Sequence, residues 1–478
     1  MNKDMRRREF LKVTAALSGA ALSLGTSSVL ALGENPKGSK IVSPGCRGSK
    51  VKVARIYMAN PQGLWPKPKL DLQNEVQFYK QKFAELADEL SDVEFVVDEL
   101  ITSPDQITGI KDRLQSADGM LIIHLSLSIM PVLEGLLAQG LPTMIFAVPF
   151  SGHDWARFGA LRNEKLGEKM DCLLTSDYRQ LSAAVRPFRA IHHLREARIL
   201  NNTESLSTEY ADQARNKFGT EIKVVTLQQM LDAYNAADNN EAKAEADKLI
   251  KQAVQVLEPS REEIVKSCRL ALAFQNLLSA ENATVMTVDC YGSMYHKLPA
   301  FPCIGFTKLN DMGLGGICES DLESAMTHII FQGLAGKPGF ISDPTMDLST
   351  NSIILAHCLG STKMAGLDKP ASPYKLRCIM ERQEGAVMQV KMHTGQKVTQ
   401  ARLIGTDLLL YFTGEIIDTP DIDRGCRTKI TVKVDGDADK LWKNWSNGLH
   451  RSTCYGDISK DLERFCRFKG IKIVNETA

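Results

Sequence analysis

Between residues 51 and 148, short apolar runs alternate regularly with longer amphipathic stretches. The apolar runs have the length and composition of buried strands, and the stretches between them show a helical repeat of three to four residues. The predicted strands are Val51–Met58, Val93–Val97, Met120–Leu125 and Thr143–Val148. This alternation indicates a parallel sheet covered by helices. No Gly-x-Gly-x-x-Gly sequence follows the first strand, which argues against a dinucleotide-binding turn.

The same alternation starts again near Leu181, and a different pattern follows Pro338. In the second region we predict strands at Arg198–Asn202, Ile222–Leu227 and Thr284–Asp289, with helices around 206–217 and 261–280. After Pro338, short strand-like runs are separated by Gly, Asp and Thr, which is typical of an antiparallel β domain. These runs are Ala386–Met392, Val398–Ile404, Leu408–Phe412 and Thr428–Val434.

The predicted fold class is therefore α/β, with two Rossmann-like parallel-sheet units followed by a smaller antiparallel β-barrel-like C-terminal domain. A flexible leader, rich in Gly, Ser, Pro and Lys, is predicted ahead of the first sheet. The predicted segments are 32–50 for the leader, 51–180 and 181–335 for the two α/β domains, and 336–478 for the β-rich domain.

Residues 1–31 are predicted to be a signal peptide. Arg7-Arg8-Glu9-Phe10-Leu11-Lys12 resembles the twin-arginine export motif, and Val29-Leu30-Ala31 offers small residues at a cleavage site. The apolar stretch between them contains many Ser, Thr and Gly residues, so it is too weakly hydrophobic for a stable membrane span. A basic amphipathic start helix is the alternative. The export motif implies the twin-arginine machinery as a partner and a periplasmic or extracytoplasmic location.

The overall composition excludes some classes of protein. The 478 residues include 58 Lys and Arg against 57 Asp and Glu, a balance that argues against nucleic-acid binding through phosphate contacts. The 11 Cys residues include no Cys-x-x-Cys pair, so a zinc ribbon and a dense disulfide scaffold are both poorly supported. The composition is that of a globular protein with ligand-binding clefts.

Two carboxylates are candidates for a shared site. Apolar residues after Glu319 recur at helical spacing, and a helix over 319–334 would place Glu319 on the same face as that stripe. A carboxylate at the head of a buried stripe needs a partner, whereas a first-turn acid favoured by the helix dipole is the simpler alternative. Pro344 favours an extended conformation at Asp343, so a return strand could bring Asp343 back near Glu319. Two carboxylates in one cleft would need a divalent cation or a shared proton between them.

Two histidines are further candidates. His450 lies in a Gly-containing loop before a strand-like segment, and His357 closes an apolar run in Ile353-Ile354-Leu355-Ala356-His357-Cys358. Loop residues often carry function. Considered singly, each histidine could equally be a hydrogen-bonded structural residue.

Together these segments resemble the fucose/arabinose isomerase family of metal-dependent sugar isomerases. The marks are a Gly-rich approach to Cys-Glu-Ser-Asp-Leu, then Gly-x-Pro-x-Phe-x-x-Asp, Ala-His-Cys and a late Leu-His followed by Tyr-Gly-Asp. The resemblance implies that Glu319, Asp343 and His450 hold a divalent metal, with Mn²⁺ expected. It also implies that His357 occupies the position of a second metal-site histidine in the arabinose branch. His124 lies in a loop that resembles one reaching a neighbouring subunit's active site, and a homo-oligomer is expected.

The resemblance implies an aldose–ketose isomerase that acts on a sugar through an enediol, with Glu319 and Asp343 as the acid/base pair. The sequence does not decide which carboxylate is the base. Two alternatives stay open at this stage. One is another metal-dependent sugar-modifying enzyme, such as an epimerase, and the other is an exported sugar-binding protein, because two α/β lobes and a cleft also describe such receptors.

Overall fold

The computed structural model describes residues 49–205 and 208–478. The predicted signal peptide, residues 1–31, and residues 32–48 of the predicted leader lie outside the described residues. Among the described helices, none combines the length and the apolar character that crossing a bilayer requires.

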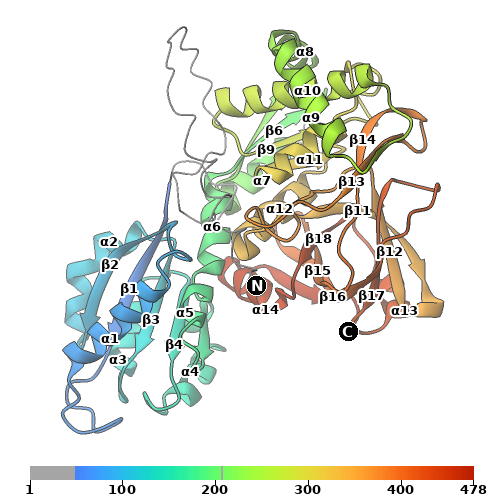
Figure 1. Cartoon of the computed structure of the whole chain (residues 1–478). Helices are drawn as coiled ribbons and strands as arrows, with labels where there is room; N and C mark the ends of the chain where they lie inside the picture. The colour runs from blue at the N-terminus through green and yellow to red at the C-terminus, as the bar shows by residue number, and fades with distance from the viewer. Residues whose placement is uncertain (1–48, 206–207) are drawn as a thin grey trace, which may run out of the picture. The chain divides into compact units, whose positions relative to one another are not determined.

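The first region forms a five-stranded sheet in which every neighbouring pair of strands is parallel (Figure 1). The strand order is β2-β1-β3-β4-β5. The strands are β1 (Val51–Met58), β2 (Val93–Ile101), β3 (Gly119–His124), β4 (Thr143–Ala147) and β5 (Met170–Leu174). The strands at the centre of this sheet are buried on both faces, which explains their nearly continuous apolar sequences.

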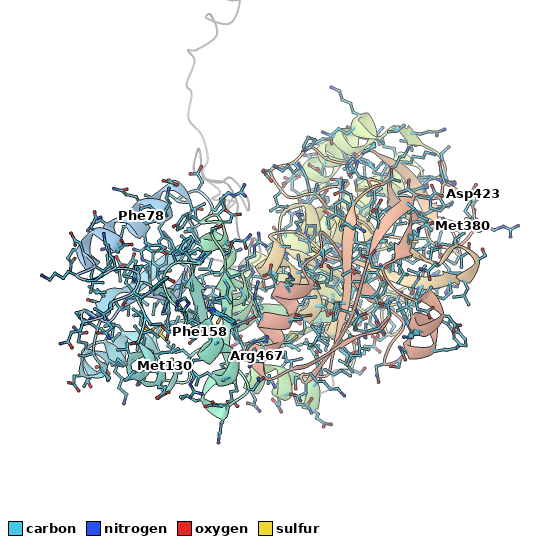
Figure 2. The ribbon with its side chains drawn as sticks, turned by 90° about the horizontal axis from the view of Figure 1, so that it is seen from below. Phe78, Met130, Phe158, Met380, Asp423 and Arg467 are labelled. Atoms are coloured by element: carbon cyan, nitrogen blue, oxygen red, sulfur yellow. The ribbon has the colours of Figure 1, made fainter. Side chains whose placement is uncertain are left out.

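Helices cover both faces of this first sheet. Helices α1 (Leu72–Glu85), α5 (Gln180–Ala183) and α6 (Arg186–Glu196) pack on one face. The other face is covered by η1 (Pro104–Ile110), α2 (Lys111–Gln115), α3 (Met130–Leu137) and α4 (Trp155–Leu161), and the short turn η2 (Lys165–Gly167) follows α4. Met130 and Phe158, labelled in Figure 2, belong to the hydrophobic cluster on this second face.

The second region forms a four-stranded parallel sheet of order β10-β9-β6-β7. Its strands are β6 (Arg198–Asn202), β7 (Glu221–Val225), β9 (Val285–Val288) and β10 (Gly315–Cys318). Helices α7 (Thr208–Phe218) and α12 (Leu322–Ala335) pack on one face together with α6, and α8 (Leu227–Ala236), α10 (Arg261–Ala280) and α11 (Cys303–Asp311) pack on the other. Helix α9 (Asn239–Gln252) packs beside α10.

The C-terminal region contains a closed antiparallel barrel of six strands, labelled β11, β12 and β15 to β18 in Figure 1. They are β11 (Phe340–Asp347), β12 (Ser352–His357), β15 (Lys397–Ile404), β16 (Leu408–Asp418), β17 (Thr428–Val434) and β18 (Arg451–Tyr455). The pairing of β15 with β16 closes the ring, which removes exposed sheet edges. The predicted fold class, two parallel-sheet units and an antiparallel barrel, is therefore confirmed.

The remaining elements of this region lie around the barrel. Strand β19 (Lys472–Asn475) adds to β16 in parallel, and η3 (Leu348–Thr350), α13 (Ala438–Asn444) and α14 (Ser459–Lys469) connect the strands. The hairpin of β13 (Tyr374–Ile379) and β14 (Glu384–Val390) does not join the barrel. It pairs instead with the two-residue strand β8 (Gln255–Val256), so a part of 336–478 forms a sheet with a segment of the second region.

Candidate active site

The register of three barrel strands brings three predicted site residues to one place. Strand β11 lies between β12 and β18, and Ser342 of β11 pairs with Arg451 while Asp343 pairs with Ala356. Asp343 therefore lies next to His450, which precedes β18, and next to His357, which ends β12. Residues more than 100 positions apart in the sequence are neighbours because the barrel closes in this register.

Glu319 comes from the second parallel sheet, and its local structure differs from the prediction. The predicted helix over 319–334 is wrong at its start, because α12 begins at Leu322 and Asp321 is its N-cap. Glu319 lies in the turn between β10 and α12, where it and Ser320 both have left-handed backbone with φ of 60° and 53°. Such a conformation costs about 1–2 kcal/mol for a residue with a Cβ, so the surrounding structure must enforce it. The Ser320 hydroxyl donates to Asn201 Oδ1 over 2.7 Å and its amide donates to the carbonyl of Val288, which fixes the turn.

The four side chains form one group. His450 Nε2 lies 3.2 Å from Asp343 Oδ1 and 3.7 Å from Glu319 Oε2, and His357 Nε2 lies 3.8 Å from Glu319 Oε1. The two imidazole rings have their centres 5.5 Å apart. Both histidines are buried, whereas each carboxylate is about one third exposed. The structure therefore places Glu319, Asp343, His450 and His357 together at a site that solvent can reach.

Within the part of the chain that the structure describes, His124 does not lie with Glu319, Asp343, His450 and His357. It ends β3 in the first sheet, where it is buried. Its Nε2 lies 2.9 Å from Asp154 Oδ2, and its Nδ1 lies 2.7 Å from the Ser151 hydroxyl, which donates to the carbonyl of Val148. These bonds satisfy both ring nitrogens. A role for His124 in the site of a neighbouring subunit stays a prediction from the resemblance.

Two residues that hold His450 in place were not among the sequence-predicted site residues. Asp321 Oδ2 accepts from His450 Nδ1 over 2.9 Å, and the same carboxylate oxygen lies 2.6 Å from Arg402 Nη1. Arg402, on β15, also binds Glu323 and the carbonyl of His450. In the sequence, Asp321 resembles an ordinary acid in the first turn of a helix, so its contact with His450 was not predicted. Arg402 interrupts an apolar strand sequence, and that charge was the only signal available.

We expect Asp321→Asn to weaken divalent-cation binding about 10- to 100-fold, the usual cost of losing a carboxylate that orients a metal-binding histidine. The neutral amide would no longer fix the proton on His450 Nδ1 or balance Arg402. Cation affinity can be measured by calorimetric titration of the metal-free chain. Asp418→Asn, an exposed acid at the end of β16, is the matched control and should leave the affinity unchanged. Equal affinity in the two variants would contradict the role of Asp321.

The surroundings of the site shift the pKa values of its carboxylates and histidines in different directions. Burial raises the pKa of Glu319, and the charges of Asp343 and Asp321 raise it further against the opposing effect of His450. Burial also acts to raise the pKa of Asp343, but the hydrogen-bonding His450 and the charge of His357 hold it below its usual value. Burial and the charge of His450 lower the pKa of His357 to about 4. Of the two carboxylates, Glu319 is thus the one that takes up a proton more readily, and Asp343 is the one that holds its charge more firmly.

The donor set fits a divalent cation. Asp321 accepts the proton of His450 Nδ1, so once Nε2 gives up its own proton its lone pair points toward the carboxylates of Asp343 and Glu319. A carboxylate–histidine pair of this kind is the usual support of a metal ligand. Two carboxylates with one imidazole suit a hard to borderline ion such as Mn²⁺.

His357 is arranged differently. The amide of Cys358 donates to His357 Nδ1 over 2.9 Å, so in the neutral ring the proton lies on Nε2, which is buried and has no hydrogen-bond partner. His357 therefore turns its Nε2–H group toward Glu319 Oε1, 3.8 Å away, and the residue also lies within metal-ligand distance of Asp343 and His450.

Cation binding at this site should depend on pH. Burial lowers the pKa of His450, but the close Asp321 and Asp343 carboxylates outweigh that effect and raise it to about 10 in the metal-free chain. A cation must displace this proton to reach Nε2, so we expect its apparent affinity to rise about tenfold per pH unit from neutral pH to about pH 9. Without metal, the raised pKa adds stability that is complete below about 6.5 and is lost as the pH rises through about 10. Calorimetry in buffers of different ionisation enthalpy would count the released proton, and a pH-independent affinity would contradict the expectation.

Comparison with known proteins gives two relatives at low identity. A sulfoquinovose isomerase of Clostridium sp. (strain MSTE9) is 23% identical over 321 residues, which are 64% of this chain and 68% of that protein. A sulfoquinovose isomerase of Alkalicoccus urumqiensis is 24% identical over 230 residues, which are 46% of this chain and about half of that protein, 51%. No family model matches the chain. The chain is thus similar to two proteins named sulfoquinovose isomerase, over 64% of its length in one case and 46% in the other.

Proposed function

We propose that the protein is an aldose–ketose isomerase that uses a divalent cation, with Mn²⁺ as the expected ion. The observation that carries this proposal is the convergence of Glu319, Asp343 and the buried Nε2 of His450 at one end of the barrel. Two proteins named sulfoquinovose isomerase support the same class of reaction. Their name also makes sulfoquinovose, an aldose with a sulfonate group, the first substrate to test.

In this proposal Glu319, Asp343 and His450 hold the cation, which supplies a Lewis acid that polarises the carbonyl and hydroxyl oxygens of an open-chain sugar. Glu319 removes the proton from the carbon beside the carbonyl and returns it to the neighbouring carbon, because its raised pKa suits a group that must both accept and give a proton. Asp343 keeps its charge, and the Nε2–H group of His357 donates a hydrogen bond to a sugar oxygen beside Glu319. The proton that leaves the sugar hydroxyl passes to the former carbonyl oxygen, so no net proton is taken up.

The proposal gives the two carboxylates different tasks, which the sequence left shared. A pair of acids with pKa values pushed in opposite directions is the usual sign of one proton-transferring group and one permanently charged group. Asp321 and Arg402 do not touch the sugar in this scheme. Their role is to fix the tautomer and the direction of the His450 ring.

Proton exchange in deuterated water tests this proposal. The metal-depleted chain is incubated with sulfoquinovose, fucose and arabinose, with and without added Mn²⁺. An isomerase labels the carbon next to the carbonyl and forms the ketose only when the cation is present. Absence of exchange with every sugar would favour a binding protein, and exchange at another centre would favour an epimerase; either result would overturn the assignment.

We also propose export by the twin-arginine route and assembly into a homo-oligomer. The export proposal rests on Arg7-Arg8-Glu9-Phe10-Leu11-Lys12. Fractionation of cells that carry the intact motif or Arg7→Lys with Arg8→Lys tests it, and sedimentation of the purified chain tests the assembly. A cytoplasmic location for both forms, or a monomer at all concentrations, would contradict these proposals.

A further inference from the structure

A second set of metal-binding side chains lies beside the candidate active site but shares no residue with the group of Glu319, Asp343 and His450. Its members are Cys358, Glu381 and Cys426, and we call it the thiol cluster. Cys358 follows β12, Glu381 lies in the turn between β13 and β14, and Cys426 precedes β17. Three segments far apart in the sequence therefore meet there.

The thiol cluster is compact enough to close around a zinc ion. The two sulfur atoms and one Glu381 oxygen all lie within 4.8 Å of one another, and Cys426 Sγ lies 3.4 Å from Glu381 Oε1. Tetrahedral zinc, with bonds of about 2.3 Å to sulfur and 2.0–2.2 Å to oxygen, sets its ligands about 3.5 to 3.8 Å apart. Only small side-chain movements would separate the present arrangement from a bound one.

Polar groups surround the sulfur atom of Cys358. The Cys426 thiol and the backbone amides of Arg427 and Met380 all face it. Cys303 packs in the same hydrophobic cluster and offers a third thiol as a fourth ligand. Glu381 is exposed, so an ion can reach the cluster from solvent.

We propose that Cys358, Cys426 and Glu381 bind a Zn²⁺ ion. Thiolates select zinc over the harder ions that suit two carboxylates and an imidazole, so the two neighbouring sites would take different metals. The zinc would tie the end of β12, which carries His357, to the β13–β14 turn and to the segment before β17. Met380 and Asp423, labelled in Figure 2, lie at the outer edge of this part of the molecule and mark where those two segments reach the surface.

A disulfide between Cys358 and Cys426 is the competing use of the same thiols. It would require an oxidant, such as a small-molecule disulfide, to accept two electrons and two protons. It would also leave the Glu381 carboxylate, which lies against Cys426, without a function. The presence of a carboxylate as third ligand therefore favours the metal.

Metal analysis of the purified full-length chain tests the proposal. After dialysis against Zn²⁺ and a weak chelator, we expect one zinc per chain that is lost in Cys426→Ser and retained in His450→Ala. Glu381→Gln changes only an exposed side chain, so it should fold and bind zinc at least tenfold more weakly. Co²⁺ in place of zinc should give a thiolate charge-transfer band that Cys426→Ser abolishes.

The matched control is Cys172→Ser, which removes a half-buried thiol from β5 in the first sheet. It should keep both the zinc and the cobalt band. Equal zinc content in the chain, Cys426→Ser and Glu381→Gln would overturn the proposal, and so would a Cys358–Cys426 disulfide found by mass spectrometry in zinc-free protein. None of these measurements depends on isomerase activity. They therefore test the zinc site independently of the proposed isomerase function.

Discussion

Glu319→Gln is expected to reduce isomerisation about 100- to 10,000-fold, the usual loss when a group that transfers protons is removed. The amide keeps the size and the hydrogen-bonding outline of the side chain but cannot accept the proton from the sugar carbon. The left-handed turn that holds residue 319 depends on backbone and Ser320 contacts, so the variant should fold normally. Initial rates with saturating Mn²⁺, and deuterium incorporation in the same samples, measure the effect.

The metal content of Glu319→Gln must be measured alongside its activity, because Glu319 also contributes a ligand in the proposed site. Saturating cation compensates for weaker binding, so a loss that persists there belongs to proton transfer. Glu463→Gln, the same chemical change at an exposed position on α14, is the control and should leave the rate unchanged. Undiminished turnover by Glu319→Gln with full metal content would refute the assignment of Glu319.

The sequence predicted the elements that have strong local patterns. β1, β6 and β17 occupy the predicted residues, and α10 has the predicted bounds Arg261–Ala280. Each of these strands is rich in β-branched residues or lies where the helical repeat of apolar residues stops. Helix α10 begins with a capping box at Ser260 and Glu263. In these segments the local sequence is sufficient to determine the secondary structure. The alternation of strands and helices could therefore be predicted from the sequence.

Strand β10 shows where local pattern is insufficient. It contains Gly315 and Gly316, which are poor strand formers, so no strand was predicted there. A Cβ on Gly316 would lie 2.4 Å from the backbone of Phe306, so the glycine is required by the close packing of α11. The contact is between β10 and α11, and the pattern of residues within either segment does not reveal it. Because β10 was missed, Glu319 was assigned to a helix instead of to the turn that follows the strand.

The sequence predicted which residues gather at the candidate site and the approach of Asp343 to Glu319, but not the hydrogen bonds that set the role of each residue. Glu319, Asp343, His450 and His357 were all named from the sequence, and the structure brings them together. Their separate roles could not be predicted, because the proton positions on the two histidines depend on partners that only the fold supplies. One ring donates from Nδ1 to a carboxylate, and the other accepts at Nδ1 from a backbone amide.

Loss of the Arg451–Glu476 ion pair is expected to have the largest effect on stability. Both side chains are almost completely buried, and Arg451 Nη2 lies 2.7 Å from Glu476 Oε1. Removing one member leaves an uncompensated buried charge, so Glu476→Ala should lower the free energy of unfolding by about 3–5 kcal/mol. Urea unfolding followed by circular dichroism measures the change.

The same substitution should also disturb the candidate site, because Arg451 holds the loop that presents His450. Its guanidinium donates to the carbonyls of Ser446, Gly448 and His450 and lies over the ring of Trp445. Lys443→Ala is the contrasting case, since its pair with Asp439 is half exposed and should contribute at most about 1 kcal/mol. Replacing Arg451 and Glu476 together by Met should recover part of the stability but not the cation affinity, because packing can substitute for the buried pair whereas nothing then binds the loop carbonyls. Full recovery of both properties would show that the pair has no role in positioning His450.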